Sequence, residues 1–262
     1  MMEPPELNEE ERATYAWQLD VGGLGEMGQR RLKGASVMVS RVGGLGGMVA
    51  LELAAAGVGR LIVAHGGVLK RSDLNRQLLM THDRAGQLRM GGAVERLRAL
   101  NPRMEIVAEA AHVGPDNAAR LVSQADIVVD CAPLFEERYE MNREAMARGI
   151  PMVEAAVNEM EFHLTTFVRG ETGCLRCLYP ENSVEWRRRF PVVSPVPGVA
   201  GSLAALEVIK LITGLGPVLK GRMLVGDLRS LQFRQFQLHR IVDCPVCGTG
   251  KASGVVNPGD TR

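Results

Sequence analysis

A short glycine-rich turn between two apolar segments constrains the fold of this 262-residue chain more than any other feature. Residues 35–41 are largely apolar and β-branched, residues 44–57 have helical composition and end in glycine, and residues 60–65 form a second apolar run. A buried parallel strand, a glycine turn, a helix and a second parallel strand form the repeating unit of a doubly wound sheet. The turn itself, residues 40–47 (SRVGGLGG), predicts a backbone loop of the kind that approaches a phosphate group.

The same alternation of helix and strand continues to residue 158. In chain order the segments are a helix at 85–102, a strand at 104–110, a helix at 115–124, a strand at 125–132, a helix at 136–149 and a strand at 150–157. Strands that alternate with helices favour a mostly parallel sheet covered by helices on both faces. We therefore predict an α/β fold built on a doubly wound, mostly parallel sheet.

The pattern changes after residue 158 and predicts an antiparallel C-terminal extension of this sheet. Residues 161–170 alternate polar and apolar side chains, as an antiparallel strand with one buried face does. The segments that follow are a proline-rich crossover at 173–201, a helix at 202–214, and strand-like runs at 222–228 and 231–238.

Four of the five cysteines form two pairs with C-x-x-C spacing, which indicates a metal site. These ligand candidates are Cys174, Cys177, Cys244 and Cys247. Thiolates bind Zn²⁺ tetrahedrally, and four of them leave no open coordination position, so the predicted zinc is structural. It would tie the crossover to the C-terminal end of the chain. The alternative is four unpaired buried cysteines.

Composition and charge argue against nucleic acid or membrane as a partner. The formal net charge is only +1, which gives no general attraction to a polyanion. We find no run of the roughly 18 apolar residues that cross a bilayer. The acidic N-terminal stretch MMEPPELNEEERATYAW lacks the basic-then-apolar pattern of a signal peptide. We therefore expect a cytoplasmic protein.

Taken together, these motifs resemble the ThiF/MoeB/HesA family, the bacterial relatives of ubiquitin-activating enzymes. The similar stretches lie between about Tyr15 and Gly248 and include GQRRLKGASVMV, GGLG, LELAAAGVGRL, LNRQLL, ERLRALNP, ADIVVD, RYEMN, CLRCLYPE, GVAGSLAALEVIKLITG and DCPVCG. The resemblance implies a Rossmann-like fold, a dimer and a structural zinc. It also implies that ATP and Mg²⁺ bind, and that the C-terminal glycine of a small β-grasp carrier, ubiquitin-like or sulfur-carrying, is adenylated.

The resemblance divides the chain into four segments and assigns site residues. The segments are an N-terminal helical dimer arm (1–32), a nucleotide-binding-type core (33–158), a unit of crossover, zinc clip and C-terminal strands (159–248), and a flexible tail (249–262). The cofactor-binding candidates are Arg41, Gly43, Gly44, Gly46, His65, Asp73, Arg76, Gln77 and Arg89. Arg76 and Asp130 are the retained candidates for catalysis.

Several positions depart from the family pattern at its phosphate, ribose and metal contacts. Arg41 replaces the first loop glycine, and His65 replaces the acidic residue that accepts bonds from the ribose hydroxyls. Trp17 replaces the arginine that reaches the triphosphate across the dimer, and Pro133 replaces the aspartate that holds Mg²⁺. Arg89 aligns with the phosphate-binding lysine, which keeps the charge but changes its geometry.

These departures lead to a first hypothesis, in which adenylation is lost or strongly weakened. A hydrogen bond to a charged group contributes roughly 1.5–3 kcal/mol, so three lost contacts cost on the order of 5–8 kcal/mol. The chain would then act as a binding module that holds a carrier-protein tail or pairs, as a homodimer or heterodimer, with an active relative.

Two further hypotheses stay open. In the second, the chain is a working adenylyltransferase in which Arg41, Arg76 and Arg89 surround the phosphates and Asp73 or Asp130 recruits the metal. In the third, the same fold binds another nucleotide or a biosynthetic intermediate, with His65 and Trp17 lining the pocket.

Overall fold

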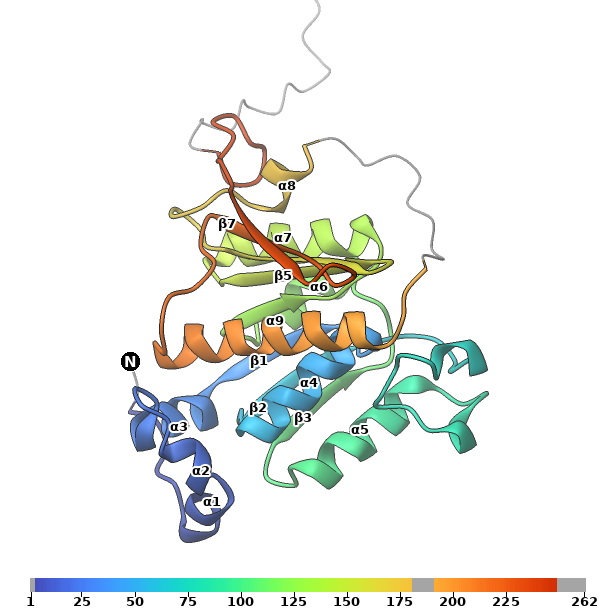
Figure 1. The fold of residues 1–262 in the computed structure, drawn as a ribbon, viewed down its shortest axis with the longest axis vertical. Helices are drawn as coiled ribbons and strands as arrows, with labels where there is room; N and C mark the ends of the chain where they lie inside the picture. The colour runs from blue at the N-terminus through green and yellow to red at the C-terminus, as the bar shows by residue number, and fades with distance from the viewer. Residues whose placement is uncertain (1–2, 181–190, 249–262) are drawn as a thin grey trace, which may run out of the picture.

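The computed structural model describes residues 3–180 and 191–248, and over these residues it confirms the predicted α/β fold. One eight-stranded sheet with the order β3-β2-β1-β4-β5-β6-β7-β8 runs through the centre of the molecule (Figure 1). Strands β3 to β5 in this order are parallel, and β6, β7 and β8 are antiparallel to their neighbours. The strands are β1 Ser36–Ser40, β2 Arg60–Ala64, β3 Glu105–Glu109, β4 Ile127–Asp130, β5 Met152–Asn158, β6 Glu161–Phe167, β7 Arg222–Asp227 and β8 Gln232–Gln237.

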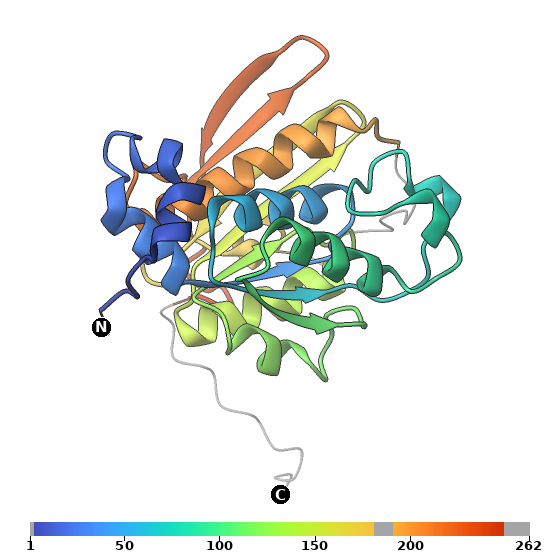
Figure 2. The same ribbon diagram turned by 90° about the horizontal axis from the view of Figure 1, so that it is seen from below.

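Helices cover both faces of the parallel part of the sheet (Figure 2). Apolar side chains of α3, α4, α5 and α9 pack on one face, and those of α6, α7 and α8 pack on the other. The helices are α1 Glu9–Thr14, α2 Ala16–Leu19, α3 Gly25–Gly34, α4 Gly44–Ala56, α5 Arg89–Leu100, α6 Ala118–Val122, α7 Phe135–Arg148, α8 Leu175–Leu178 and α9 Pro195–Thr213. The predicted tail at 249–262 lies outside the described residues.

Helix α9 starts seven residues before the predicted helix at 202–214, because two prolines open its first turn. Proline fits the first turn of a helix, where its missing N–H group has no intrahelical partner. By length and composition alone α9 is also apolar enough to cross a membrane, although Glu207 and Lys210 interrupt its sequence. Half of it is buried, and it packs against α4 and β5 as a core helix.

The glycine turn after β1 lets α4 lie directly on the backbone of that strand. Arg41 takes a left-handed conformation with φ 59°, which costs a side chain with a Cβ about 1–2 kcal/mol. A Cβ at Gly46 would lie 2.4 Å from the carbonyl oxygen of Arg41 and 2.9 Å from that of Ser40. The third glycine of the loop therefore permits this close packing, whatever ligand the loop holds.

We expect Gly46→Ala to lower the free energy of unfolding by about 3 kcal/mol, because the new methyl group meets backbone that cannot move without shifting β1. Gly47→Ala in the same helix is the matched control. Its Cβ would lie at an ordinary 3.5 Å from Leu79 and from the backbone oxygen of Val42, and alanine favours helix by about 1 kcal/mol over glycine. Urea unfolding of the two variants measures the difference, and equal stabilities would contradict this account of Gly46.

Candidate nucleotide and metal sites

The four paired cysteines come together where α8 meets the turn after β8. Their Sγ atoms all lie within 4.8 Å of one another, with Cys174 3.7 Å from Cys244 and Cys177 3.4 Å from Cys247. Four sulfurs placed tetrahedrally at about 2.3 Å from a zinc ion lie about 3.8 Å apart. The donor set and its spacing therefore fit one tetrahedral metal ion, as the sequence predicts, and zinc is the metal that four thiolates favour.

Two N–H donors point at the sulfurs from outside the cluster. Asn142 of α7 donates to Cys174 Sγ at 3.7 Å, and the backbone of Ile241 donates to Cys177 Sγ at 3.4 Å. Burial raises the pKa of the Cys174 thiol to about 11, so this thiol keeps its proton until a cation binds. Burial acts in the same direction on Cys244, but backbone N–H groups led by that of Cys247 outweigh it and lower this pKa. Such donors orient thiolates and stabilise their charge.

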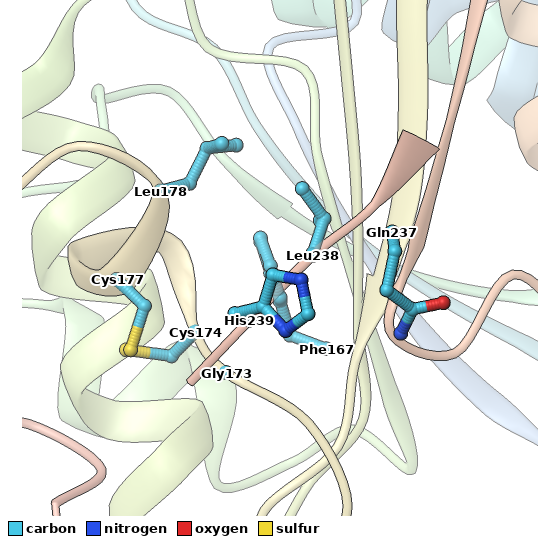
Figure 3. A pocket seen from close by; sticks show the side chains of 8 residues that line it. All are labelled: Phe167, Gly173, Cys174, Cys177, Leu178, Gln237, Leu238 and His239. Carbon is cyan, nitrogen blue, oxygen red and sulfur yellow. The ribbon is translucent and has the colours of Figure 1, made fainter. Parts of the chain in front are cut away.

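A cavity of roughly 170 Å³ opens beside this cluster (Figure 3). It is lined by Phe167, Gly173, Cys174, Cys177, Leu178, Gln237, Leu238 and His239. A metal ion held by all four sulfurs has no open position toward the cavity, so the site can clip segments together but cannot activate a substrate.

We expect the purified chain to hold about one zinc ion, and Cys244→Ala to lose it because three ligands leave the coordination sphere open. Cys131→Ala is the control, since Cys131 is buried elsewhere in the core and should keep the metal. Elemental analysis after dialysis gives the metal content, and thermal unfolding should show a lower midpoint for Cys244→Ala only. A stoichiometric metal in Cys244→Ala would contradict the assignment.

The arginine in the glycine loop folds inward and is buried. Its guanidinium forms a bidentate ion pair with Glu137, with Nε 2.7 Å from Oε2 and Nη2 bonded to Oε1. Nη1 lies 3.1 Å from His112 Nε2. Glu137 lies in the first turn of α7, so this pair joins the loop after β1 to the helix after β4.

The other two predicted arginines share one carboxylate. Arg89 Nη2 lies 2.5 Å from Asp73 Oδ2, and Arg76 Nη2 lies 3.4 Å from Asp73 Oδ1. Burial alone would raise the pKa of Asp73, but the hydrogen bond and charge of Arg89 outweigh it and lower this pKa. Asp73 is therefore ionised at neutral pH. Three arginines and two carboxylates, counting Arg41 and Glu137, leave this region with a net charge of 3 − 2 = +1.

His65 and Gln77 meet at the N-terminus of α4. A Cβ on Gly43 would lie 3.6 Å from both His65 Cε1 and Gln77 Nε2. Burial, helped by the charges of Arg41 and Arg89, lowers the pKa of His65 to about 3, so its ring is neutral. Nδ1 of His65 and Oε1 of Gln77 are buried and have no hydrogen-bond partner among the described residues. Helix α4 begins here without a side-chain cap, which leaves backbone N–H groups for a ligand.

Asp130, the predicted catalytic carboxylate, contacts a different arginine, Arg138, within a buried network. Its Oδ1 accepts the backbone N–H of Ala132 at 2.9 Å, and its Oδ2 lies 3.7 Å from Arg138 Nε. Glu154 is the neighbour of Asp130 in the β4–β5 register. Its Oε1 lies 2.7 Å from Arg138 Nη1 and 3.0 Å from His163 Nε2.

The two carboxylates of this network respond differently to burial. Burial raises the pKa of Asp130 to about 7, and the charge of Glu154 adds to this against the opposing charge of Arg138. Burial also acts on Glu154, but His163 and Arg138 outweigh it and keep its pKa below the usual range. At neutral pH a substantial fraction of Asp130 therefore still holds a proton, while Glu154 stays ionised. A protonated, fully buried carboxyl group is a poor ligand for Mg²⁺.

We expect Asp130→Asn to make the slope of stability against pH more positive between about pH 4 and pH 7. In this window the unfolded chain ionises Asp130 and the folded chain largely does not, so the contribution of Asp130 to the free energy of unfolding falls as pH rises, and the variant lacks that contribution. Urea unfolding at several pH values measures both slopes, and the isosteric amide removes only this ionisation. Parallel slopes for the two proteins would show that the ionisation of Asp130 does not contribute to the pH dependence of stability.

Sequence motifs did not reveal the partners of these site residues. Glu137, His112 and the pair Glu154–His163 come from other elements, and only the fold brings them to Arg41 and Asp130. Trp17 lies on α2 with 93% of its surface exposed, so it packs little against the described residues of its own chain. The assignment of ligand-binding and catalytic roles to the predicted residues stays a prediction.

The fold and its sites together define a class of protein. A doubly wound sheet with a glycine loop after its first strand continues into an antiparallel extension that a tetrathiolate clip fastens. This combination is the one expected of the family of activating adenylyltransferases that the sequence motifs resemble. The chain belongs to the ThiF family, whose model matches residues 15–246.

Curated relatives agree with this family. Protein HesA of Leptolyngbya boryana is 47% identical over 93% of this chain and 88% of its own length. The sulfur carrier protein adenylyltransferase of Thermus thermophilus is 36% identical over 91% of this chain and 92% of its own. The adenylyltransferase and sulfurtransferase MOCS3 of Sus scrofa is 38% identical over 94% of this chain, which spans 55% of that longer protein.

Solved structures show the same fold at lower identity. The crystal structure of E. coli MccB superposes with a TM-score of 0.81 at 22% identity, covering 96% of this chain and 76% of MccB. PaaA superposes with a TM-score of 0.77 at 20% identity, covering 90% of this chain and 76% of PaaA. At these identities the likeness extends to the fold alone.

Proposed function

We propose that this ThiF-family chain has lost or strongly weakened ATP-dependent adenylation and acts as a binding module for a carrier protein or a partner chain. The observation that carries the proposal is the buried ion pair between Arg41 and Glu137 inside the nucleotide loop. Arg41 cannot contact a phosphate while Glu137 holds it. Removing one partner of a buried ion pair costs about 3–5 kcal/mol, so the pair opposes the opening of the loop.

The charge around α4 supports this proposal. ATP brings about four negative charges near neutral pH, whereas the three arginines and their two carboxylates leave +1. Relatives of this class offset the excess with Mg²⁺, but Pro133 supplies no carboxylate here. Asp130 is fully buried and, with a pKa of about 7, partly protonated at neutral pH, which makes it a poor replacement for that ligand.

The relatives support a carrier as the partner. One is named for the adenylation of a sulfur carrier protein, and such carriers in the family are small β-grasp proteins. We include in the proposal a homodimer or a heterodimer with an active relative, a zinc ion in the cysteine clip, and a cytoplasmic location. The exposed indole of Trp17 on the N-terminal arm offers a large apolar contact for a partner chain.

A specific observation favours one second candidate, the binding of a different nucleotide. The neutral His65 ring and the Gln77 amide offer buried acceptors beside the N-terminus of α4, where a ribose hydroxyl could donate. A neutral imidazole therefore replaces the lost acidic residue as an acceptor but not as a charge. The working adenylyltransferase, by contrast, requires that Asp73 and Glu137 release their arginines.

Calorimetric titration with ATP, with and without Mg²⁺, tests the proposal. We expect no magnesium-dependent heat at up to about 1 mM nucleotide, because internal carboxylates already occupy the arginines. The Thermus thermophilus adenylyltransferase is the positive control. Magnesium-dependent binding in the micromolar range, with pyrophosphate exchange that Arg76→Ala abolishes, would instead establish a rebuilt active site. Binding of a nucleoside monophosphate without metal would support the second candidate.

A further inference from the structure

The two edges of the sheet are built differently. Edge strand β3 carries Glu105 and Glu109, which pair with Arg60 and Arg120. Charged residues of this kind block the pairing of an edge with another chain. Edge strand β8 has the sequence QFRQFQ, and all six of its residues are exposed. It carries one charge, Arg234, and no proline, so this edge is open to another strand.

The hydrogen-bond register shows which groups of β8 face outward. The N–H of Leu238 donates to the carbonyl of Gly221 at 2.8 Å, so these residues form a hydrogen-bonded pair. Hydrogen-bonded and non-bonded pairs alternate along an antiparallel ladder. Residues 232, 234 and 236 therefore bond to β7. The N–H and carbonyl groups of residues 233, 235 and 237 point away from it, and no described strand pairs with them.

Apolar side chains flank this edge on both faces of the sheet. Phe233 is half exposed and makes an edge-on contact with Phe162, with ring centroids 5.7 Å apart. Phe236 is half exposed and points to the opposite face, and Leu231 at the hairpin tip is 73% exposed. Figure 2 shows the β7–β8 hairpin projecting beyond the helices, in keeping with the exposure of all six residues of β8.

The charge of the hairpin decides what kind of strand fits. Residues 222–238 contain Arg222, Arg229 and Arg234 but only one acidic residue, Asp227, which gives 3 − 1 = +2. A second copy of the chain would bring two hairpins of charge +2 together, which costs energy. An acidic strand would instead gain ion pairs with Arg234 and Arg222, whereas Arg229 already lies 3.8 Å from Glu159.

We propose that β8 is a docking edge for an extended acidic strand of another protein, which adds to the sheet by main-chain hydrogen bonds. Outward groups of residues 233, 235 and 237 provide the hydrogen bonds, the two phenylalanines provide apolar contact, and the arginines select the charge. This interaction goes beyond the proposed function, because it uses neither the α4 loop nor the C-terminal tail of a carrier.

The probe is a capped eight-residue peptide of alternating glutamate and valine, and its lysine–valine counterpart is the control. We expect the acidic peptide to bind the full chain at least about tenfold more tightly. Amide hydrogen exchange should slow at residues 233, 235 and 237, while residues 234 and 236 are already protected by β7. Equal affinity for the two peptides, or unchanged exchange at the outward amides, would overturn the proposal.

Two variants separate strand pairing from general charge attraction. Gln235→Pro removes one outward N–H without breaking the ladder to β7 and should weaken binding about tenfold, whereas Gln235→Ala keeps that N–H and the affinity. Arg234→Glu should shift the preference toward the lysine peptide. Protection of the outward amides without peptide would also overturn the proposal, because it would assign the edge to a second copy or to the chain's own residues.

Discussion

The buried ion pair between Arg41 and Glu137 is the interaction on which the shape of the glycine loop depends. Arg41 sits in a left-handed conformation that a glycine adopts without strain, and its guanidinium is buried beside the neutral ring of His65. A buried charge without a partner costs several kcal/mol, so the guanidinium of Arg41 needs a partner in this position. Glu137 supplies that partner in a bidentate geometry, so an ion pair to α7 holds the loop in this conformation.

Helix α7 carries this effect to the rest of the molecule. Within about one and a half turns it presents Glu137 to the loop, Arg138 to the carboxylates of β4 and β5, and Asn142 to the cysteine clip. Each of these side chains is buried. A shift of α7 that released Arg41 would therefore also disturb the Asp130–Glu154 network and the hydrogen bond to Cys174. The closed loop is stabilised by contacts far from the nucleotide position.

The sequence was sufficient to predict the elements that local pattern determines. The alternation of apolar runs and helices predicted the parallel sheet, and the doubled C-x-x-C spacing predicted the sulfur cluster, which the fold assembles from α8 and the turn after β8. The ion pairs of the site could not be predicted from local sequence pattern. Arg41 alone suggests either a blocked or a rebuilt phosphate site, and the choice depends on Glu137, 96 positions away. No periodicity or spacing rule links two such residues.

The protonation states of Asp130 and His65 could not be predicted from the sequence for the same reason. Residue type alone does not show how deeply a side chain is buried or which charges surround it. An aspartate at a strand end looks like a free carboxylate, but complete burial beside the charged Glu154 favours its protonated form and raises its pKa to about 7. A histidine in place of an acid looks like a loss, yet burial near two arginines keeps it neutral and preserves an acceptor. Only the first effect opposes the binding of Mg²⁺–triphosphate, because it weakens a negative ligand for the metal, whereas the second keeps an acceptor for a hydroxyl group without a charge. The metal position and the ribose position have thus both become less negative, and Glu137 offsets the positive charge that Arg41 brings to the loop.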